Sequence, residues 1–333
     1  MCNCCVTRLH APSFLLGVLL TLPSILYFWY GAGFGTWPSF FDSYNYDDEG
    51  IVYDEELPIL LRNTSMDTNT VILTSVNEAW AAPNSLLDLF LESFHAGEEI
   101  EHLLKHLLII AMDPRAYERC MEVHPHCYFL KTKGIDYSSE KVYMSKDYLE
   151  MVWGRNKLQQ RILELGFNFL LTDVDILWFR NPMKYISTTS HLTFASDYYF
   201  GNAKSLRNVA NGGFVYVRSC NETVKFYKSW HQARKKYPEQ HDQKVLNKVK
   251  RDLTSRYHVK IRFIDTAYCS GFCQFKTDVK KICTIHANCC IGLGNKTADL
   301  RNILDDWKRY KSLSFWQKRK GQFRLRAPQC RMR

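Results

Sequence analysis

Two aspartates at positions i and i+2, Asp173 and Asp175, are the residues of this chain best placed to do chemistry. They follow an apolar run at residues 167–171 that has the length of a buried strand. Side chains alternate along a strand, so these two carboxylates project from one face and repel each other. A divalent cation with oxygen ligands resolves that repulsion and leaves positions for phosphate oxygens. The alternative is a solvated loop in which either aspartate caps a turn, but the apolar strand before the pair favours a metal.

Three weaker signals follow in order along the chain. Asn211-Gly212-Gly213 precedes an apolar run, and glycines let a ligand approach the backbone, although a plain tight turn explains them equally well. Asp242 and Gln243 open a helical stretch, where Asp242 can simply be an N-cap. His286 ends an apolar run and precedes the Gly-rich loop that carries Lys296. A histidine at a strand end can complete a metal site, and a lysine on such a loop can meet phosphates.

The elements that must position these groups alternate between apolar strands and helices. Apolar runs predict strands at residues 71–76, 107–112, 127–130, 167–171, 191–195, 213–217, 261–264 and 282–286. Helices are predicted at 84–91, with Asn84 as N-cap, and at 145–165, ended by Gly166. This alternation predicts an α/β fold, a mostly parallel sheet flanked by helices. Ligands of such sheets bind beyond the carboxyl ends of strands, where the aspartate pair falls.

The N-terminal part of the chain predicts a membrane anchor. Residues 11–41 carry no charge, and residues 14–30 are strongly apolar and end in four aromatics; about 20 such residues span a bilayer core. Arg8 precedes this segment, and only acidic charges follow it up to Arg62. We therefore expect a cytosolic tail at 1–10, a transmembrane signal anchor at 11–30 and a luminal stem with little structure at 31–69. A signal peptide cleaved near Gly31-Ala32-Gly33 is the alternative.

The twelve cysteines fit the same topology. Those at positions 2, 4 and 5 fall on the predicted cytosolic side, where acylation is one fate. The other nine fall in the oxidising lumen, where disulfides form, and an odd number leaves at least one thiol free or paired between chains. A Cys120–Cys127 bridge would close a short loop, and at least one bridge is expected among the cysteines at 273, 283, 289 and 290. Zinc is disfavoured because the spacings give no two CxxC pairs.

The positive charge of the chain is concentrated at its C-terminal end. Ten Lys and Arg but no acids lie between Lys308 and Arg333, whereas the rest of the chain balances 34 basic against 34 acidic residues. This pattern predicts a solvated, loosely held basic tail at 311–333. Anionic lipid headgroups or an acidic polysaccharide are the partners such a tail would meet, and nucleic acid is not expected on the luminal side.

The succession of motifs resembles the GT-A glycosyltransferases, and more closely the plant-type nucleotide-diphospho-sugar transferase family, which includes cell-wall arabinosyl- and xylosyltransferases. The resemblance covers roughly residues 71–307. It is carried by residues 73–80 (LTSVNEAW), 173–175 (DVD), 211–214 (NGGF), 241–243 (HDQ) and 286–290 (HANCC). It implies a GT-A, Rossmann-like domain at residues 70–310.

The resemblance also implies a metal site and a donor substrate. Asp173, Asp175 and His286 would hold Mn²⁺ or another divalent cation that bridges the two phosphates of a nucleotide sugar, in particular a UDP-sugar. Lys296 would meet the diphosphate. The enzyme would be a Golgi-resident, type II membrane protein.

The transfer step is implied on the same basis. Asn211 and Gly212 would line the sugar pocket, and Asp242 or Gln243 would lie near the anomeric carbon of a sugar transferred with retention to a cell-wall glycan or glycoprotein acceptor. The alternative from another class is a catalytically silent luminal binding or scaffold protein on the same fold. A calcium-binding module is excluded because the Asp-x-Asp pair lacks the following residues of an EF-hand loop.

Overall fold

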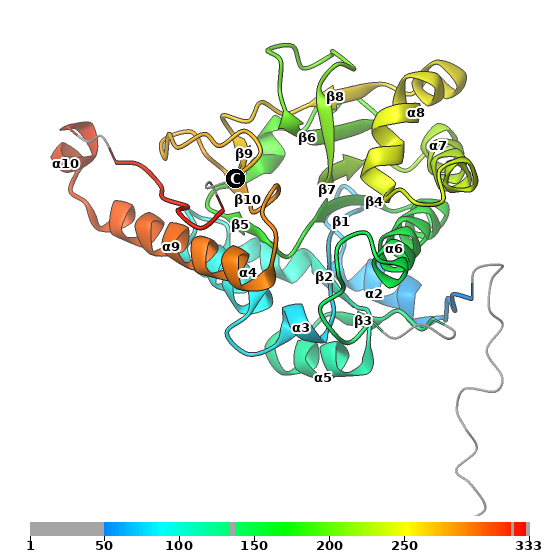
Figure 1. Ribbon diagram of the computed structural model, residues 1–333, viewed down its shortest axis with the longest axis horizontal. Coiled ribbons are helices and arrows are strands. Elements are labelled where there is room, and N and C mark those ends of the chain that lie inside the picture. The colour runs from blue at the N-terminus through cyan, green and yellow to red at the C-terminus, as the bar shows by residue number, and fades with distance from the viewer. Residues whose placement is uncertain (1–49, 133–136, 321–322, 331–333) are drawn as a thin grey trace, which may run out of the picture. The chain divides into compact units, whose positions relative to one another are not determined.

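The computed structural model describes residues 50–132, 137–320 and 323–330 (Figure 1). The predicted cytosolic tail, the signal anchor at 11–30 and the first part of the stem lie outside the described residues. Among the residues that are described, no helix is both long and apolar enough to cross a membrane.

A seven-stranded sheet with the order β3-β2-β1-β4-β7-β6-β8 lies at the centre of the fold. Its strands are β1 (Thr70–Val76), β2 (Leu107–Ala111), β3 (Cys127–Phe129), β4 (Asn168–Thr172), β6 (Leu192–Tyr198), β7 (Val209–Val217) and β8 (Ile261–Phe263). Four of the six pairings are parallel, and only β7 runs antiparallel to its neighbours β4 and β6. The mostly parallel sheet predicted from the apolar runs is confirmed.

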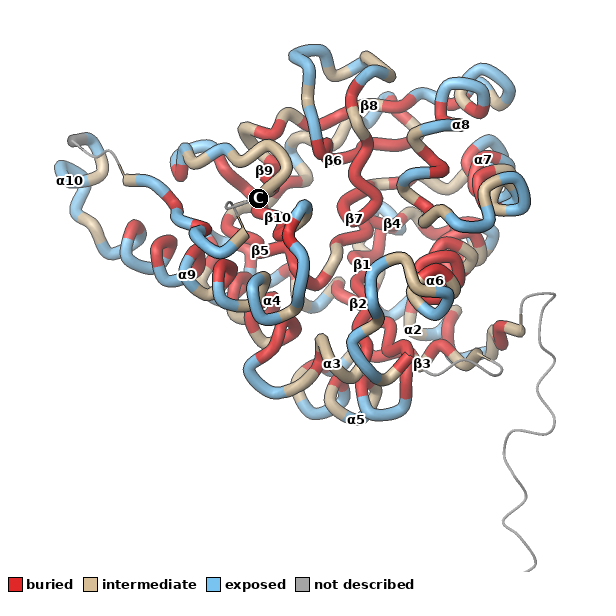
Figure 2. The backbone as a smooth tube through the Cα atoms, in the orientation of Figure 1, coloured by how far each residue is buried: buried red, intermediate tan, exposed pale blue. Residues whose placement is uncertain are grey.

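Alternation along the strands divides the apolar side chains between two cores. In β1, Ile72 joins one core and its neighbours Val71 and Leu73 join the other, as expected for side chains on opposite faces. The first core is covered by α4 (Leu86–Ala96), α5 (Pro114–Val123) and α9 (Leu293–Ser312). The second is covered by α2 (Glu56–Thr64), α6 (Lys146–Glu164), α7 (Asn221–Gln232) and α8 (Asp242–Tyr257). Figure 2 shows the strands buried between helices whose outer turns are exposed.

A three-stranded sheet extends the first core beside the aspartate pair. It has the order β5-β10-β9, from β5 (Ile176–Trp178), β10 (Thr284–His286) and β9 (Cys269–Gly271). His286 on β10 pairs with Ile176 on β5 in antiparallel register. Because Ile176 directly follows Asp175, this register brings His286, which is 110 positions after Ile176 in the sequence, next to the carboxylates. The remaining elements are α3 (Glu78–Ala81), η1 (Glu101–His106), η2 (Pro182–Tyr185), η3 (Ala233–Lys236) and α10 (Phe315–Lys320).

One predicted helix boundary is wrong. The helix expected at 84–91 is α4, which begins after Ser85 as N-cap, whereas Asn84 adopts a left-handed conformation with φ 63°. Asparagine tolerates this conformation because its short polar side chain can hydrogen-bond locally. The backbone N–H of Asn84 donates to Asp88 at 2.7 Å. The helix predicted at 145–165 is confirmed as α6, with the Ser145 side chain capping it.

The predicted stem is partly folded. Residues from Ile51 onward belong to the domain, since Ile51 pairs with Thr132 and α2 buries Leu57 and Leu61 completely in the second core. The prediction of little structure up to residue 69 is therefore wrong. Its cause is that the acidic composition of this region hides a short amphipathic helix whose apolar stripe covers the sheet.

The basic tail is also held more firmly than predicted where it is described. Leu325 and Ala327 are buried in the first core, and Cys330 is bonded to Cys290. The Arg326 guanidinium lies 2.9 Å from the buried carboxylate of Asp306 in α9. Charge composition alone predicted a C-terminal segment without fixed contacts, but two buried apolar residues and a disulfide fix residues 323–330 against α9.

Candidate active site

The aspartate pair lies in the turn between β4 and β5, at the carboxyl end of β4. The backbone N–H of Asp173 donates to the carbonyl of Gly213 in β7 at 2.7 Å. The carbonyl of Asp175 accepts from the backbone N–H of Ala287, the residue after β10, at 3.0 Å. Two neighbouring strands therefore fix the turn, and Asp175 is only 6% exposed.

The structure brings the three predicted metal-ligating residues together. Nε2 of His286 lies 3.1 Å from Oδ1 of Asp175 and 3.8 Å from Oδ2 of Asp173, and one ligand atom from each residue lies within 4.8 Å of the other two. The adjacent wall is Gly213, where a Cβ would lie 2.2 Å from Oδ2 of Asp173 and 2.8 Å from Cε1 of His286. Two carboxylates and an imidazole are donors that suit Mn²⁺, so these residues fit the implied ion.

Two cationic side chains meet these carboxylates. Nη1 of Arg155 lies 2.5 Å from Asp173, and Nζ of Lys296 lies 2.6 Å from Asp175. Burial favours the protonated form of Asp175, but Lys296 and then His286 outweigh burial and hold its pKa well below the usual range. Burial opposes the charge on Lys296 and His286, yet the same carboxylates raise the pKa of both above their ordinary values. The site is a compact set of paired opposite charges.

The residues predicted near the sugar meet at a buried carboxylate, Asp197 at the end of β6. Oδ1 of Asp197 accepts from the side-chain amides of Asn211 and Asn288, each at 2.7 Å, and Oδ2 accepts from Gln243 at 2.7 Å. The Gln243 oxygen in turn accepts the backbone N–H of Gly212 at 2.7 Å. This network fixes the orientation of three amide side chains around one carboxylate.

Two interpretations of these motifs are corrected by the structure. Asn211, Gly212 and Gly213 do not form a turn before a strand but lie inside β7. Asp242 is not an N-cap, because His241 holds that position and Asp242 is the first residue of α8. The Asp242 carboxylate is buried, accepts the backbone N–H of Gln243 at 2.8 Å and lies 3.8 Å from Nη2 of Arg155. All the predicted site residues thus belong to one connected region.

Two residues of this region were missed from the sequence. Asp197 follows an apolar run, as Asp173 does, and this shared pattern could have identified it. Arg155 lies in the middle of α6 among residues of mixed polarity, and nothing in its spacing distinguishes it from a surface arginine. Its contact with Asp173 depends on how α6 packs on the sheet.

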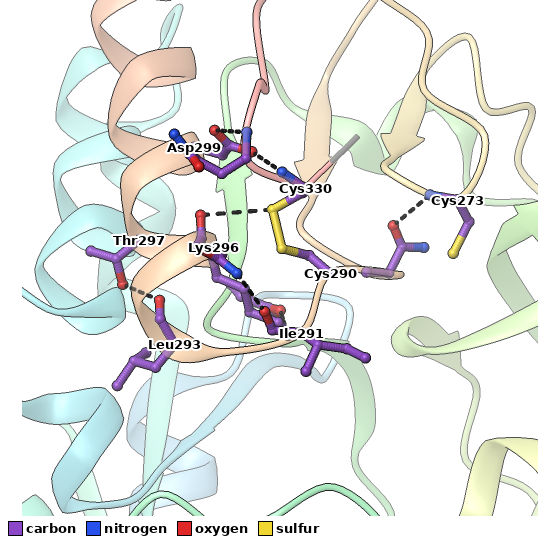
Figure 3. Close-up of a disulfide and its surroundings, with 12 residues drawn as sticks. Cys273, Cys290, Ile291, Leu293, Lys296, Thr297, Asp299 and Cys330 are labelled. Atoms are coloured by element: carbon purple, nitrogen blue, oxygen red, sulfur yellow. Dashed lines mark hydrogen bonds and ion pairs between the residues drawn. A yellow bond between two sulfur atoms is a disulfide. The ribbon is translucent and has the colours of Figure 1, made fainter. Parts of the chain in front are cut away.

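Two disulfides hold the loop between His286 and Lys296 at the adjacent residues Cys289 and Cys290. Cys273 is bonded to Cys289. Figure 3 shows the second bridge, between Cys290 and Cys330. Next to the second bridge, the buried Asp299 of α9 accepts the backbone N–H groups of residues 329 and 330 at 3.1 and 2.7 Å. The C-terminal segment therefore holds the first turns of the helix that carries Lys296.

The two predicted disulfides are confirmed. Cys120 in α5 is bonded to Cys127 in β3, and the Cys273–Cys289 bridge is the one expected near His286. Three thiols among the described residues remain free, at positions 220, 269 and 283. The partner of Cys290 was not predicted, because it comes from the C-terminal segment that was expected to be loose.

Comparison with known proteins identifies the family. Residues 102–300 match the model of the nucleotide-diphospho-sugar transferase family. The chain belongs to this family. An uncharacterized protein of Arabidopsis thaliana is 42% identical to this transferase over 260 residues, which is 78% of this chain and 69% of that protein.

Characterised relatives are more distant. The Arabidopsis thaliana UDP-D-xylose:L-fucose alpha-1,3-D-xylosyltransferase 3 is 23% identical over 235 residues, 63% of this chain and 58% of its own. Among solved structures, a glycosyltransferase involved in the glycosylation of the major capsid of PBCV-1 has a TM-score of 0.40 and 13% identity, over 70% of this chain and 98% of its own. Family membership makes this transferase a glycosyltransferase, and the predicted enzyme class is confirmed.

Proposed function

We propose that this glycosyltransferase uses a divalent cation, Mn²⁺ in the first instance, to transfer a sugar from a UDP-sugar to a cell-wall glycan or glycoprotein. The observation that carries the proposal is the convergence of Asp173, Asp175 and His286 at the carboxyl end of β4, within 4.8 Å of one another. Parallel α/β sheets bind ligands at this edge. The xylosyltransferase relative, by its name, uses UDP-D-xylose.

Charge balance supports a role for Lys296 at the diphosphate. Its ammonium now neutralises Asp175 at 2.6 Å. A divalent cation held by Asp173, Asp175 and His286 would take over that neutralisation and would stabilise the charge that develops on the leaving diphosphate. Lys296 would then be free to pair with a phosphate oxygen of the donor. A buried ammonium near the leaving group stabilises a developing dianion more strongly than it would in water.

The residues around Asp197 support the proposal that the transferred sugar binds next to them. Asn211, Gly212 and Gln243 are linked through hydrogen bonds of 2.7 Å, so a sugar bound there would meet amides that are already oriented. Asp242 is a buried carboxylate next to this network. Together, Asp242 and Gln243 offer oxygen atoms to a sugar that becomes positively charged at its anomeric carbon, as expected for retaining transfer.

The test is donor-dependent release of UDP from the purified full chain. A panel of UDP-sugars is assayed with Mn²⁺ and with EDTA. We expect release from one or a few donors, loss with EDTA, and at least a hundredfold loss in Asp175→Asn, since a metal ligand contributes several kcal/mol. The control is Asp252→Asn, which removes a carboxylate from an exposed ion pair on α8. No release from any donor would favour the silent scaffold protein instead.

We further propose that the enzyme is a Golgi type II membrane protein whose catalytic domain is luminal, anchored by residues 11–30. Three N-glycosylation sequons begin at Asn63, Asn221 and Asn295, and all three asparagines are exposed. We expect glycans at Asn63 or Asn221 but not at Asn295, because its neighbour Lys296 faces Asp175. Peptide mapping after glycosidase treatment measures this. Unmodified asparagines at all three sequons would contradict the luminal topology.

A further inference from the structure

Two large aromatic side chains are exposed side by side on α10. Phe315 is 65% exposed and Trp316 is 68% exposed, and their ring centroids lie 5.6 Å apart. Single exposed apolar side chains are normal on protein surfaces, whereas adjacent ones form a patch. This helix lies beyond the end of α9 that is far from the small sheet (Figure 1). The patch is therefore open to a partner from outside the domain.

Positive charge surrounds this patch. The Arg319 guanidinium lies 5.7 Å from the centre of the Phe315 ring, and no acidic residue occurs in the sequence from 308 to 333. Two nearby carboxylates, one on α4 and one on α9, are each shared between two cations, and Asp305 on α9 is a third, exposed carboxylate. Glu92 pairs with Arg301 and Lys308, and Asp306 pairs with Arg309 and Arg326. Each carboxylate neutralises only one charge, so the end of α9 keeps a positive excess.

We propose that α10 and the cations beside it bind the surface of a bilayer that contains anionic lipids. Tryptophan and phenylalanine partition into the membrane interface, and basic side chains next to them are attracted to anionic headgroups. The combination distinguishes the possible partners. An acidic polysaccharide would satisfy the charge but offers no apolar phase to the two rings, and a second copy of the chain would bring like charges together.

The position of the patch is compatible with catalysis. Lys296 lies in the first turn of α9 and α10 follows the last, and the 20 residues of α9 correspond to about 30 Å at 1.5 Å per residue. Contact of α10 with a membrane would therefore leave the candidate active site free. The proposed membrane contact does not depend on the proposed donor or metal, so the membrane proposal and the functional proposal can fail independently.

The test measures hydrogen–deuterium exchange of the full chain in nanodiscs of phosphatidylcholine, with or without 30% phosphatidylglycerol. We expect peptides covering residues 313–319 to exchange several-fold more slowly in the anionic discs. Phe315→Ser/Trp316→Ser should abolish that protection. Lys318→Gln/Arg319→Gln should weaken it about fivefold per charge, since each basic residue near an anionic surface contributes a factor of that order. Phe200→Ser, which removes an aromatic of 59% exposure elsewhere, is the matched control.

Three results would overturn the proposal. One is equal exchange of residues 313–319 in the two kinds of disc. Another is protection that rises with protein concentration in detergent without lipid, which would assign the patch to a second copy. The last is protection by soluble polygalacturonate with none from anionic lipid, which would assign it to an acidic polysaccharide. Because the substituted side chains are exposed, an unchanged melting temperature should show that each variant is folded.

Discussion

Replacing Gly213 by alanine tests the candidate metal site at its tightest contact. An added Cβ would lie 2.2 Å from Oδ2 of Asp173, 2.6 Å from its Cγ and 2.8 Å from Cε1 of His286. Ordinary contact begins at 3.4 Å, so the carboxylate would have to move by about 1 Å. The backbone cannot easily absorb that shift, because the N–H of Asp173 is bonded to the carbonyl of Gly213 itself at 2.7 Å.

The expected loss follows from this displacement. A misplacement of about 1 Å in a catalytic arrangement costs roughly a hundredfold in rate, or about 2.7 kcal/mol of transition-state stabilisation. Overpacking also costs about 1–3 kcal/mol of folding stability. We therefore expect Gly213→Ala to fold with a melting temperature several degrees lower, to turn over at least a hundredfold more slowly and to require more Mn²⁺.

The assay is UDP release across a Mn²⁺ titration, with Mn²⁺ binding followed separately by electron paramagnetic resonance. Gly212→Ala is the matched control on the same strand. Its Cβ would lie 3.3 Å from Cβ and 3.5 Å from Oε1 of Gln243, close to the 3.4 Å of ordinary contact. Gln243 would have to move by only about 0.1 Å, so we expect less than a tenfold loss. Wild-type turnover and Mn²⁺ affinity in Gly213→Ala would refute the proposed site.

Three further predictions concern other parts of the structure. Cys290→Ser/Cys330→Ser opens a loop whose ends are 40 positions apart, so it should lower the free energy of unfolding by about 4 kcal/mol and weaken donor binding. Removing the Cys120–Cys127 disulfide should only lower stability, so an equal donor KM in the two variants would contradict a role for the C-terminal segment in donor binding. Asp242→Asn should lower turnover roughly a hundredfold with little change in melting temperature, because Asn keeps an oxygen that can accept the backbone N–H of Gln243 and Arg155 keeps its contact with Asp173. Equal turnover would leave Gln243 as the better candidate. Burial lowers the pKa of Lys250 to about 8, so between about pH 8 and 10 the unfolded chain binds more protons at this residue than the folded chain does. The contribution of Lys250 to the free energy of unfolding therefore rises with pH in this range. Lys250→Met should show a smaller rise in melting temperature over the same range than wild type does.

Much of the fold follows from local patterns in the sequence. The strands of the seven-stranded sheet were predictable because a buried strand needs a run of apolar residues and little else, whereas β5 and β9, of three residues each, were not predicted. Ser145 and Gly166 mark the ends of α6 through capping and a left-handed conformation, which depend only on near neighbours. The Cys120–Cys127 bridge was predictable because the two cysteines are only seven positions apart and can close a short loop. Asp173 and Asp175 stood out because two carboxylates follow an apolar run at positions i and i+2, although the structure places them in the turn after β4 and not in a strand.

Only the tertiary structure decided what those residues meet. Arg155 reaches Asp173 because α6 packs on the sheet at one particular rotation, and Asp197 gathers amides from three separate segments. Cys290 finds Cys330 across 40 residues, against the expectation of a loose tail. Hydrophobic periodicity in a sequence predicts which face of a helix or strand is buried, but it does not predict which distant element covers that face. For this protein, the sequence was sufficient to single out Asp173, Asp175 and His286, which the structure brings together, whereas their charge partners and the walls of the site depended on long-range packing.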